Sequence, residues 1–292
     1  KVSSKVRDQY EESPYPKWID LGLILSPAPI AKVVKALKVR LADHKIFEVE
    51  APAILIAGCG TGQHSIDTAA RFKNAKVLAI DLSLSSLAYA QRKTEAFGVQ
   101  NLEYMQADLL DLGQLNKTFD IIESSGVLHH MEKPMAGWKV LVSCLKVGGL
   151  MKIGLYSELA RQHIAKMREE IQQLNTETDH IGMKRFRNGV IRSKAPHHQL
   201  IISSPDFHSM GSLQDLLFHV QEHRFTIPQI QHCLTKLGLK FCGFEVGTIT
   251  QDFKRTNSGE DDAYDLIKWH TYEEAHPHAF AGMYQFWCQK VG

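Results

Sequence analysis

The sequence predicts an α/β protein with a seven-strand, mostly parallel sheet and helices on both of its faces. Between residues 53 and 155, short continuous apolar runs alternate with segments of helical character. Buried parallel strands joined by crossover helices produce this alternation. In addition, a turn with glycines at positions 58, 60 and 62 follows the first apolar run, where doubly wound sheets bind their ligands.

The first half of the sheet follows from these runs in order. We expect strands over residues 53–57, 76–80, 101–105, 119–123 and 149–155, and helices over 63–72, 83–97 and 134–145. Ser83 has the side chain of an N-cap for the second helix, and Gly98 ends that helix.

The alternation stops after Tyr156, and helical patterns replace it over residues 157–174, 212–220 and 228–237. A sixth strand over 239–246, a helix over 261–275 and a seventh strand over 281–289 then complete the sheet. The predicted parts are an N-terminal helical lid or lead-in (1–50), the ligand-binding half of the core (51–155), a mainly helical insertion that caps the substrate (156–237), and the completion of the sheet (238–292).

Composition narrows the class of protein. The 292 residues are 44% apolar, which allows a substantial core, and no apolar run is long enough to cross a bilayer. The chain starts at Lys1 without a signal peptide, and we expect it to belong to a longer cytoplasmic protein. Five scattered cysteines without C-x-x-C spacing predict no metal site, and a net charge of +2 argues against nucleic acid as a partner.

The glycine turn indicates a nucleoside ligand. A dinucleotide fingerprint would place glycine or alanine where Gln63 stands, and the Lys-Ser/Thr pair of a Walker loop is absent. Asp81 follows the second strand, where a carboxylate can accept hydrogen bonds from both hydroxyls of a ribose. Its negative charge disfavours a 2′-phosphate.

Five segments resemble, in order and spacing, the motifs of class I S-adenosylmethionine-dependent methyltransferases, which share a Rossmann-like sheet. They lie at residues 54–62, 79–83, 107–109, 119–131 and 145–150. The resemblance implies S-adenosylmethionine as cofactor and S-adenosylhomocysteine as product. The cofactor-binding residues that it implies are Gly58, Cys59, Gly60, Gly62, Asp81, Leu82, Asp108, Leu109, Ser125 and Gly126.

Two segments outside the core, at 10–18 and 215–223, resemble the methyltransferase module that some bacterial proteins carry after tetratricopeptide repeats. This resemblance implies a repeat domain on the N-terminal side and a protein or peptide as methyl acceptor. A small-molecule acceptor and an inactive, cofactor-binding scaffold remain as alternatives, followed by RNA as acceptor and by a nicotinamide-dependent oxidoreductase.

Methyl transfer does not require a catalytic dyad, because the cofactor carries the reactivity and the protein aligns the reactants. His129 and His130 follow the fourth strand, where a histidine can orient the substrate or accept a proton. The alternative is structural: one histidine caps the following helix and the other packs in the core. Glu123 lies within that strand, in a buried hydrogen-bonding role or a catalytic one.

His219 and His223 stand four residues apart on the helix expected over 212–220 and beyond, so they would share one face with Asp215. Three interpretations fit these histidines. They line the entrance of the substrate pocket, they bind a metal, or they belong to an amphipathic helix whose buried face includes Val220. The spacing alone does not decide among these roles.

The aromatic residues Tyr10, Tyr15 and Trp18 precede the core with two prolines among them, and they form a lid or cover an apolar patch. Tyr15 is the first candidate to touch cofactor or substrate. The candidate catalytic residues are therefore His129, His130, Tyr15 and His219. The basic run over residues 184–194 is interpreted as a solvated loop or a phosphate-binding segment.

Overall fold

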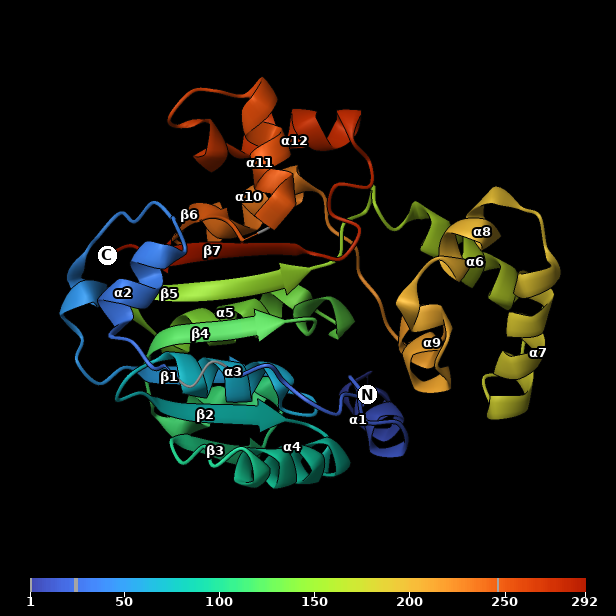
Figure 1. The fold of residues 1–292 in the computed structure, drawn as a ribbon, viewed down its shortest axis with the longest axis horizontal. Coiled ribbons are helices and arrows are strands. Elements are labelled where there is room, and N and C mark those ends of the chain that lie inside the picture. Colours follow the sequence, from blue (N-terminus) through green and yellow to red (C-terminus); the bar gives the residue numbers. More distant parts are fainter. Residues whose placement is uncertain (1, 24–25, 246) are drawn as a thin grey trace.

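The computed structural model describes residues 2–23, 26–245 and 247–292. Seven strands in these residues form one sheet in the order β3-β2-β1-β4-β5-β7-β6 (Figure 1). Their bounds are β1 (Ala53–Ala57), β2 (Lys76–Asp81), β3 (Leu102–Gln106), β4 (Phe119–Ser125), β5 (Leu145–Leu155), β6 (Leu239–Phe244) and β7 (Tyr284–Lys290).

The strands β1 to β5 pair in parallel, and β7 runs antiparallel to both β5 and β6. The chain leaves β1 toward β2 and β3 on one side and returns to β4 and β5 on the other. The carboxyl ends of β1 and β4 therefore flank the crevice at which doubly wound sheets bind ligands. The predicted seven-strand, mostly parallel sheet is confirmed.

Helices cover both faces of the sheet, as the continuous apolar strands require. Along β1, Leu55 and Ala57 belong to one buried cluster, while Ile54 and Ile56 belong to another on the opposite face. The first cluster includes side chains from α5 (Pro134–Cys144), α10 (Ile227–Lys236), α11 (Gly247–Thr256) and α12 (Leu266–Ala275). The second includes side chains from α2 (Ile30–Ala36), the short η1 (Lys45–Glu48), α3 (Gln63–Arg71) and α4 (Leu84–Ala96).

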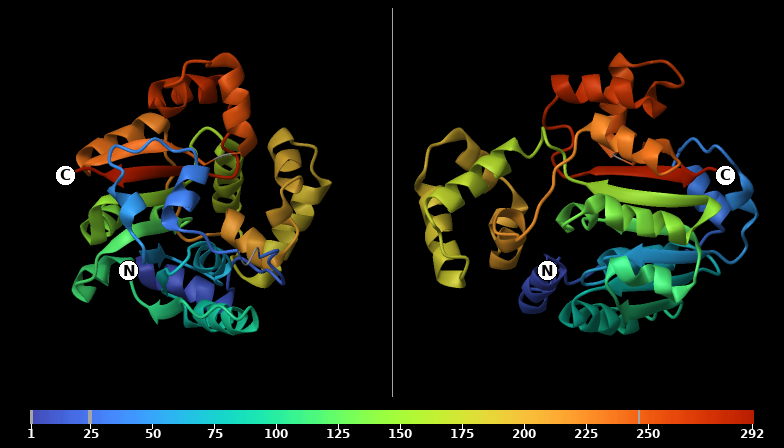
Figure 2. Two further views of the ribbon diagram at one scale, coloured as in Figure 1. Left: turned by 60° about the vertical axis from the view of Figure 1, so that its left-hand side comes forward. Right: turned by 180° about the vertical axis from the view of Figure 1, so that it is seen from behind.

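The insertion has an apolar cluster of its own, which contains Ile164, Met183, Ile201 and Leu213. It consists of α6 (Gln162–Gln173), α7 (His180–Arg192), α8 (Pro196–Ile202), η4 (Pro205–Phe207) and α9 (Met210–Leu217). Figures 1 and 2 show it beyond the carboxyl ends of the strands, set apart from the sheet. The insertion was predicted to extend to residue 237. In the structure α10 packs on the sheet and belongs to the core instead.

The N-terminal helix α1 (Val2–Glu12) lies at the same edge of the sheet as the insertion (Figure 1). The Glu11 carboxylate accepts hydrogen bonds from the backbone N–H groups of Leu84 and Ser85, at 2.7 and 2.9 Å, at the start of α4. On its other side, Gln9 accepts a bond from the backbone N–H of Val220, at 3.3 Å. The helix therefore bridges the core and the insertion.

The predicted helix that carries His219 and His223 is wrong. The helix α9 ends at Leu217, both histidines follow it in an irregular segment, and Val220 is 46% exposed rather than buried. The Arg168 guanidinium donates hydrogen bonds to the backbone carbonyls of Leu217 and His219, at 3.3 and 2.6 Å. A side chain from α6 thus satisfies the carbonyls at the end of the helix, and the chain turns away.

Other segments also differ from their predictions. Residues 184–192 of the basic run lie on α7, so the predicted loop is wrong there. The helix predicted over 261–275 contains the short η5 (Asp262–Tyr264), and α12 begins only at Leu266, where the Asp265 carboxylate caps it. The predicted end of the sixth strand at residue 246 lies outside the described residues. Among the helices of the described ranges, none has the length and apolar character that a membrane span requires.

Candidate functional site

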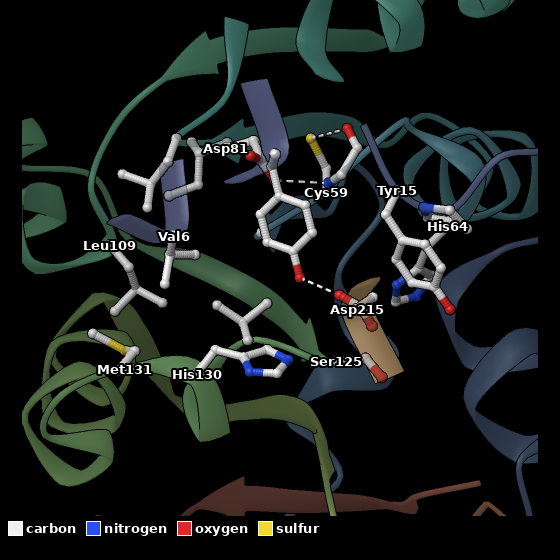
Figure 3. A pocket seen from close by; sticks show the side chains of 18 of the residues that line it. Val6, Tyr15, Cys59, His64, Asp81, Leu109, Ser125, His130, Met131 and Asp215 are labelled. Atoms are coloured by element: carbon white, nitrogen blue, oxygen red, sulfur yellow. Dashed lines mark hydrogen bonds between the residues drawn. The ribbon is translucent and has the colours of Figure 1, made fainter. Parts of the chain in front are cut away.

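A cavity of about 270 Å³ lies at the carboxyl edge of the sheet, between the ends of β1, β2 and β4 and the helices α1 and α9 (Figure 3). The structure brings nine of the residues predicted for the cofactor to its wall. They are Gly58, Cys59, Gly60, Asp81, Leu82, Asp108, Leu109, Ser125 and Gly126. Elements that are distant in sequence thus meet around one cavity.

The glycine turn has a backbone that other residues rarely adopt. Gly58, Gly60 and Gly62 have φ angles of +79°, +51° and +89°. A Cβ atom on Gly60 would lie 2.5 Å from the carbonyl oxygen of Tyr15, so a side chain there would collide with the segment that precedes the core. Gly62 is not among the lining residues: it precedes α3 and packs against Ala90 of α4.

The carboxylate of Asp81 is fixed by the turn that it faces. One of its oxygens accepts a hydrogen bond from the backbone N–H of Gly60 at 2.7 Å, and the other accepts one from Ser83 at 3.0 Å. Burial raises the pKa of Asp81, and these hydrogen bonds oppose the rise. A carboxylate oxygen accepts more than one hydrogen bond, so this group fits the paired hydroxyls of a ribose.

The wall next to Asp81 is an apolar slot. Leu82, Ala107, Leu109 and Met131 contribute to it, and Val6 of α1 faces them (Figure 3). Asp108 borders the slot, and its carboxylate accepts a hydrogen bond from the Leu110 N–H at 3.0 Å, at the start of η2 (Leu109–Leu115). Such a slot with a polar border suits a flat purine base.

The other end of the cavity is aromatic and acidic. The Tyr10 hydroxyl donates a hydrogen bond to Asp215 Oδ1 at 2.7 Å, which joins α1 to α9 (Figure 3). Tyr15 and Tyr156 also line the cavity, and burial together with the charge of Asp215 raises the pKa of both. Burial raises the pKa of Asp215 to about 6, although the bond from Tyr10 opposes the rise. Burial, with the nearby Asp215, also raises the pKa of Tyr10, so this tyrosine remains a neutral donor.

The predicted catalytic histidines separate into two groups. His130 lines the cavity from η3 (Leu128–His130), and its Nδ1 lies 2.7 Å from the backbone carbonyl of Gln221. That carbonyl can only accept, so Nδ1 carries the proton and Nε2 is an acceptor. Burial lowers the pKa of His130 to about 3, which keeps the ring neutral.

The other two histidines lie behind this wall. The ring of His219 stacks on His130 with centroids 3.6 Å apart, and the ring of His129 stacks on Tyr156 at 3.8 Å. Neither is among the lining residues, and neither ring nitrogen of His129 has a hydrogen-bond partner in the described chain. Of the predicted catalytic residues, the structure therefore brings His130 and Tyr15 to the cavity.

Residues 54–149 match the family model of a methyltransferase domain. This part of the chain is a class I S-adenosylmethionine-dependent methyltransferase domain. Its cofactor is S-adenosylmethionine, which fits the glycine turn, the Asp81 carboxylate and the apolar slot. When bound, the cofactor supplies a methyl group activated by a sulfonium.

Among known proteins, the chain is 32% identical over 236 residues to an uncharacterized protein of Synechococcus, and the match covers 76% of this chain and 56% of that protein. It is 31% identical over 118 residues to the malonyl-[acyl-carrier protein] O-methyltransferase of Halalkalibacterium halodurans, covering 39% and 43% of the two chains. The structure of PKMT2 from Rickettsia typhi in complex with AdoHcy shares the fold, with a TM-score of 0.66, 15% identity, and coverage of 95% of this chain and 55% of that one. The chain thus spans about half the length of these relatives.

Several residues that line the cavity were absent from the sequence predictions. Tyr156 directly follows β5, so its position at the carboxyl edge of the sheet was a usable signal. Met283 precedes β7, and because β7 is antiparallel, its first residues meet the carboxyl ends of the parallel strands. Ser3 and Val6 of α1 carry no local signal, because their place depends on how α1 docks.

Glu123 lies beside the cavity wall and holds α3 on β4. Its fully buried carboxylate accepts a hydrogen bond from the Thr68 hydroxyl at 2.9 Å, and it pairs with His64 at 2.5 Å and Arg71 at 3.2 Å. Burial alone would raise the pKa of Glu123, but His64, Arg71 and the nearby Lys152 outweigh it and hold the pKa at about 2. Of the two roles predicted for Glu123, the contacts favour the buried hydrogen-bonding one.

We expect Glu123→Ala to lower the free energy of unfolding at pH 7 by about 3 kcal/mol, because it leaves Arg71 and His64 without their buried carboxylate. Urea-induced unfolding measures this change. A pKa lowered on folding stabilises the protein above the usual pKa of 4.5 and loses that effect as the pH falls toward about 2. Glu103→Ala, at an exposed position of β3, is the matched control. Equal losses in both variants would contradict the role of Glu123.

Proposed function

We propose that this domain transfers the methyl group of S-adenosylmethionine to a side-chain amine of a polypeptide. The observation that carries the proposal is the buried Asp215 carboxylate, which lines the same cavity as the glycine turn and lies near Ser125 (Figure 3). Tyr10 donates a hydrogen bond to it, and Tyr15 and Tyr156 lie near enough that its charge, after burial, contributes to raising their pKa values. A carboxylate among aromatic rings attracts an alkylammonium group through its charge and through cation–π contacts.

The nearest cation does not neutralise this carboxylate directly. The Arg161 guanidinium lies over the ring of Tyr156, 3.6 Å from its centroid, and pairs with the buried Glu222 at 2.9 Å. Asp215 therefore retains its charge for an incoming group. An anionic acceptor would meet repulsion from Asp215, which favours an amine over a carboxylate.

An ammonium must lose its proton before its nitrogen can attack a methyl group. Tyr10 occupies Oδ1 of Asp215, and Oδ2 makes no hydrogen bond to another side chain in the described part of the protein. A carboxylate with a pKa of about 6 is a better proton acceptor than His130, whose pKa is about 3. We assign Asp215 Oδ2 to the binding of the ammonium and the removal of its proton, and His130 Nε2 to orienting the nitrogen.

Two observations support a polypeptide as the acceptor. The acidic end of the cavity is formed by α1 and α9, which lie beyond the carboxyl ends of the strands, between the sheet and the rest of the insertion (Figure 1). A side chain that extends from a larger surface can enter from this edge of the sheet. In addition, the relative from H. halodurans is, by its name, an O-methyltransferase that acts on a malonyl group carried by an acyl-carrier protein, so its acceptor is presented by a protein although the methylated atom is oxygen.

The test uses radiolabelled S-adenosylmethionine and a soluble extract freed of small molecules. We expect the label in protease-sensitive material that keeps it in base, since methylamines are stable there and methyl esters are not. Asp215→Asn should lower the rate of incorporation about 10–100-fold while leaving cofactor binding intact. Label that is recovered only as a small molecule, or lost in base, would contradict the amine and polypeptide assignments. Cofactor binding without transfer to any fraction would favour an inactive scaffold.

A further inference from the structure

A cluster of side chains that can bind a metal lies in the insertion, away from the methyltransferase cavity. Glu170 comes from α6, and His197 and His198 come from the first turn of α8. The Nε2 atom of His197 lies 2.5 Å from Glu170 Oε1, and that of His198 lies 2.7 Å from Glu170 Oε2. One ligand atom from each of the three side chains lies within 4.8 Å of the others. Two imidazoles and one carboxylate thus converge between two helices.

We propose that Glu170, His197 and His198 form a zinc site that joins α6 to α8. Imidazole nitrogens and carboxylate oxygens are zinc ligands, and three protein ligands leave the fourth tetrahedral position to water. Both Nε2 atoms face the Glu170 carboxylate, and the ligand atoms of the three side chains lie within 4.8 Å of one another, so they can converge on one ion. Bonds of about 2.0–2.1 Å place tetrahedral ligand atoms about 3.3 Å apart. The present N···O separations need to open by less than 1 Å, as small side-chain rotations allow.

The surroundings of the three side chains suit a bound ion. The side chains of His197 and His198 are only 13% and 14% exposed, and that of Glu170 is 27% exposed, so the site is shielded but reachable by an ion. Calcium and magnesium prefer sets of oxygen ligands, whereas zinc prefers nitrogen-containing sets such as this one. A bound ion would hold together the insertion that carries α9 and Asp215.

The ligand atoms of another group of side chains do not converge on one point in this way. This group consists of His130, Asp215 and His219. The rings of His130 and His219 are stacked at 22°, with centroids 3.6 Å apart. The lone pairs of stacked rings lie side by side and do not meet at one point. Moreover, Nδ1 of each ring already bonds to the backbone of Gln221. This group belongs to the wall of the methyltransferase cavity.

The test is to treat the whole chain with a chelator, remove the chelator, and then titrate Zn²⁺ while calorimetry measures binding. We expect one equivalent to bind and the thermal unfolding midpoint to rise. Co²⁺ should give the absorption of a four-coordinate nitrogen and oxygen site without a thiolate charge-transfer band, because the five cysteines are buried elsewhere. Mg²⁺ should not compete.

Glu170→Gln and His197→Gln should each weaken Zn²⁺ binding at least about tenfold, since even partners outside the ligand shell cost that much. Both variants should keep normal S-adenosylmethionine binding, which shows that they fold. His180→Gln, at an exposed position of α7, is the matched control and should bind Zn²⁺ as the parent does.

Absence of Zn²⁺ binding to the parent would overturn the proposal. So would Zn²⁺ binding that persists in Glu170→Gln and His197→Gln but is lost in His219→Gln, because it would place the ion at the cavity. A thiolate band with Co²⁺ would overturn it as well. These outcomes do not depend on methyl transfer, so the zinc site and the proposed function can fail separately.

Discussion

Asp81→Ala should weaken the binding of S-adenosylmethionine about 100-fold or more while the domain stays folded. The carboxylate is positioned by the N–H groups of Gly60 and Ser83, and it faces the cavity at the end of β2. Hydrogen bonds to a charged acceptor contribute about 1.5–3 kcal/mol each. The loss of two bonds to the ribose therefore costs about 3 kcal/mol or more, and 1.4 kcal/mol corresponds to about tenfold in affinity.

Calorimetry with S-adenosylmethionine measures this loss, and thermal unfolding reports whether the variant is folded. Asp81→Asn keeps one oxygen acceptor and should lose less affinity than the alanine variant. Asp111→Ala, on the exposed side of η2, changes the net charge equally and should bind normally. Near-normal affinity in Asp81→Ala would remove Asp81 from the cofactor site.

The cofactor half of the fold could be predicted because its signals are local. The strand predicted over residues 53–57 matches β1, and that over 76–80 misses only the last residue of β2. Apolar runs mark strands that are buried on both faces, and the positive φ angles of the turn require glycine whatever packs around it. These properties can be read without knowing which distant segment lies nearby.

The insertion could not be predicted as well, because its geometry depends on contacts between distant segments. The end of α9 at Leu217 depends on Arg168 from α6 and on Gln9 from α1, and neither glycine nor proline marks it. The bond between Tyr10 and Asp215 joins residues 205 positions apart. For α7 the signal was present, since Asp179 caps its first turn, but the basic run that follows suggested a loop.

The second large effect is expected for Asp215→Asn, which should lower kcat/KM for the acceptor about 10–100-fold. The substitution removes one charged hydrogen bond, which contributes about 1.5–3 kcal/mol, and it keeps an oxygen for Tyr10. The affinity for S-adenosylmethionine should be unchanged. In the parent, kcat/KM should rise with pH through about 6 as Asp215 ionises, and the asparagine variant should lose this rise.

Tyr10→Phe is the matched control for this prediction. It keeps the charge of Asp215 but removes the hydrogen bond that lowers its pKa, so the rise of kcat/KM should move to higher pH. A rise near pH 6 that persists in Asp215→Asn would assign the titration to another group and contradict the role of Asp215.

Stability should change in the opposite direction from activity. Because burial raises the pKa of Asp215 from 3.8 to about 6, folding favours its protonated form. Its contribution to stability is therefore complete below pH 3.8 and is lost as the pH rises through about 6. Urea-induced unfolding at pH 7 should show Asp215→Asn to be more stable than the parent, with the difference disappearing below pH 3.8. Asp215 would then destabilise the fold at neutral pH and yet be required for turnover. Its interaction with a cationic acceptor would explain why a carboxylate occupies this buried position.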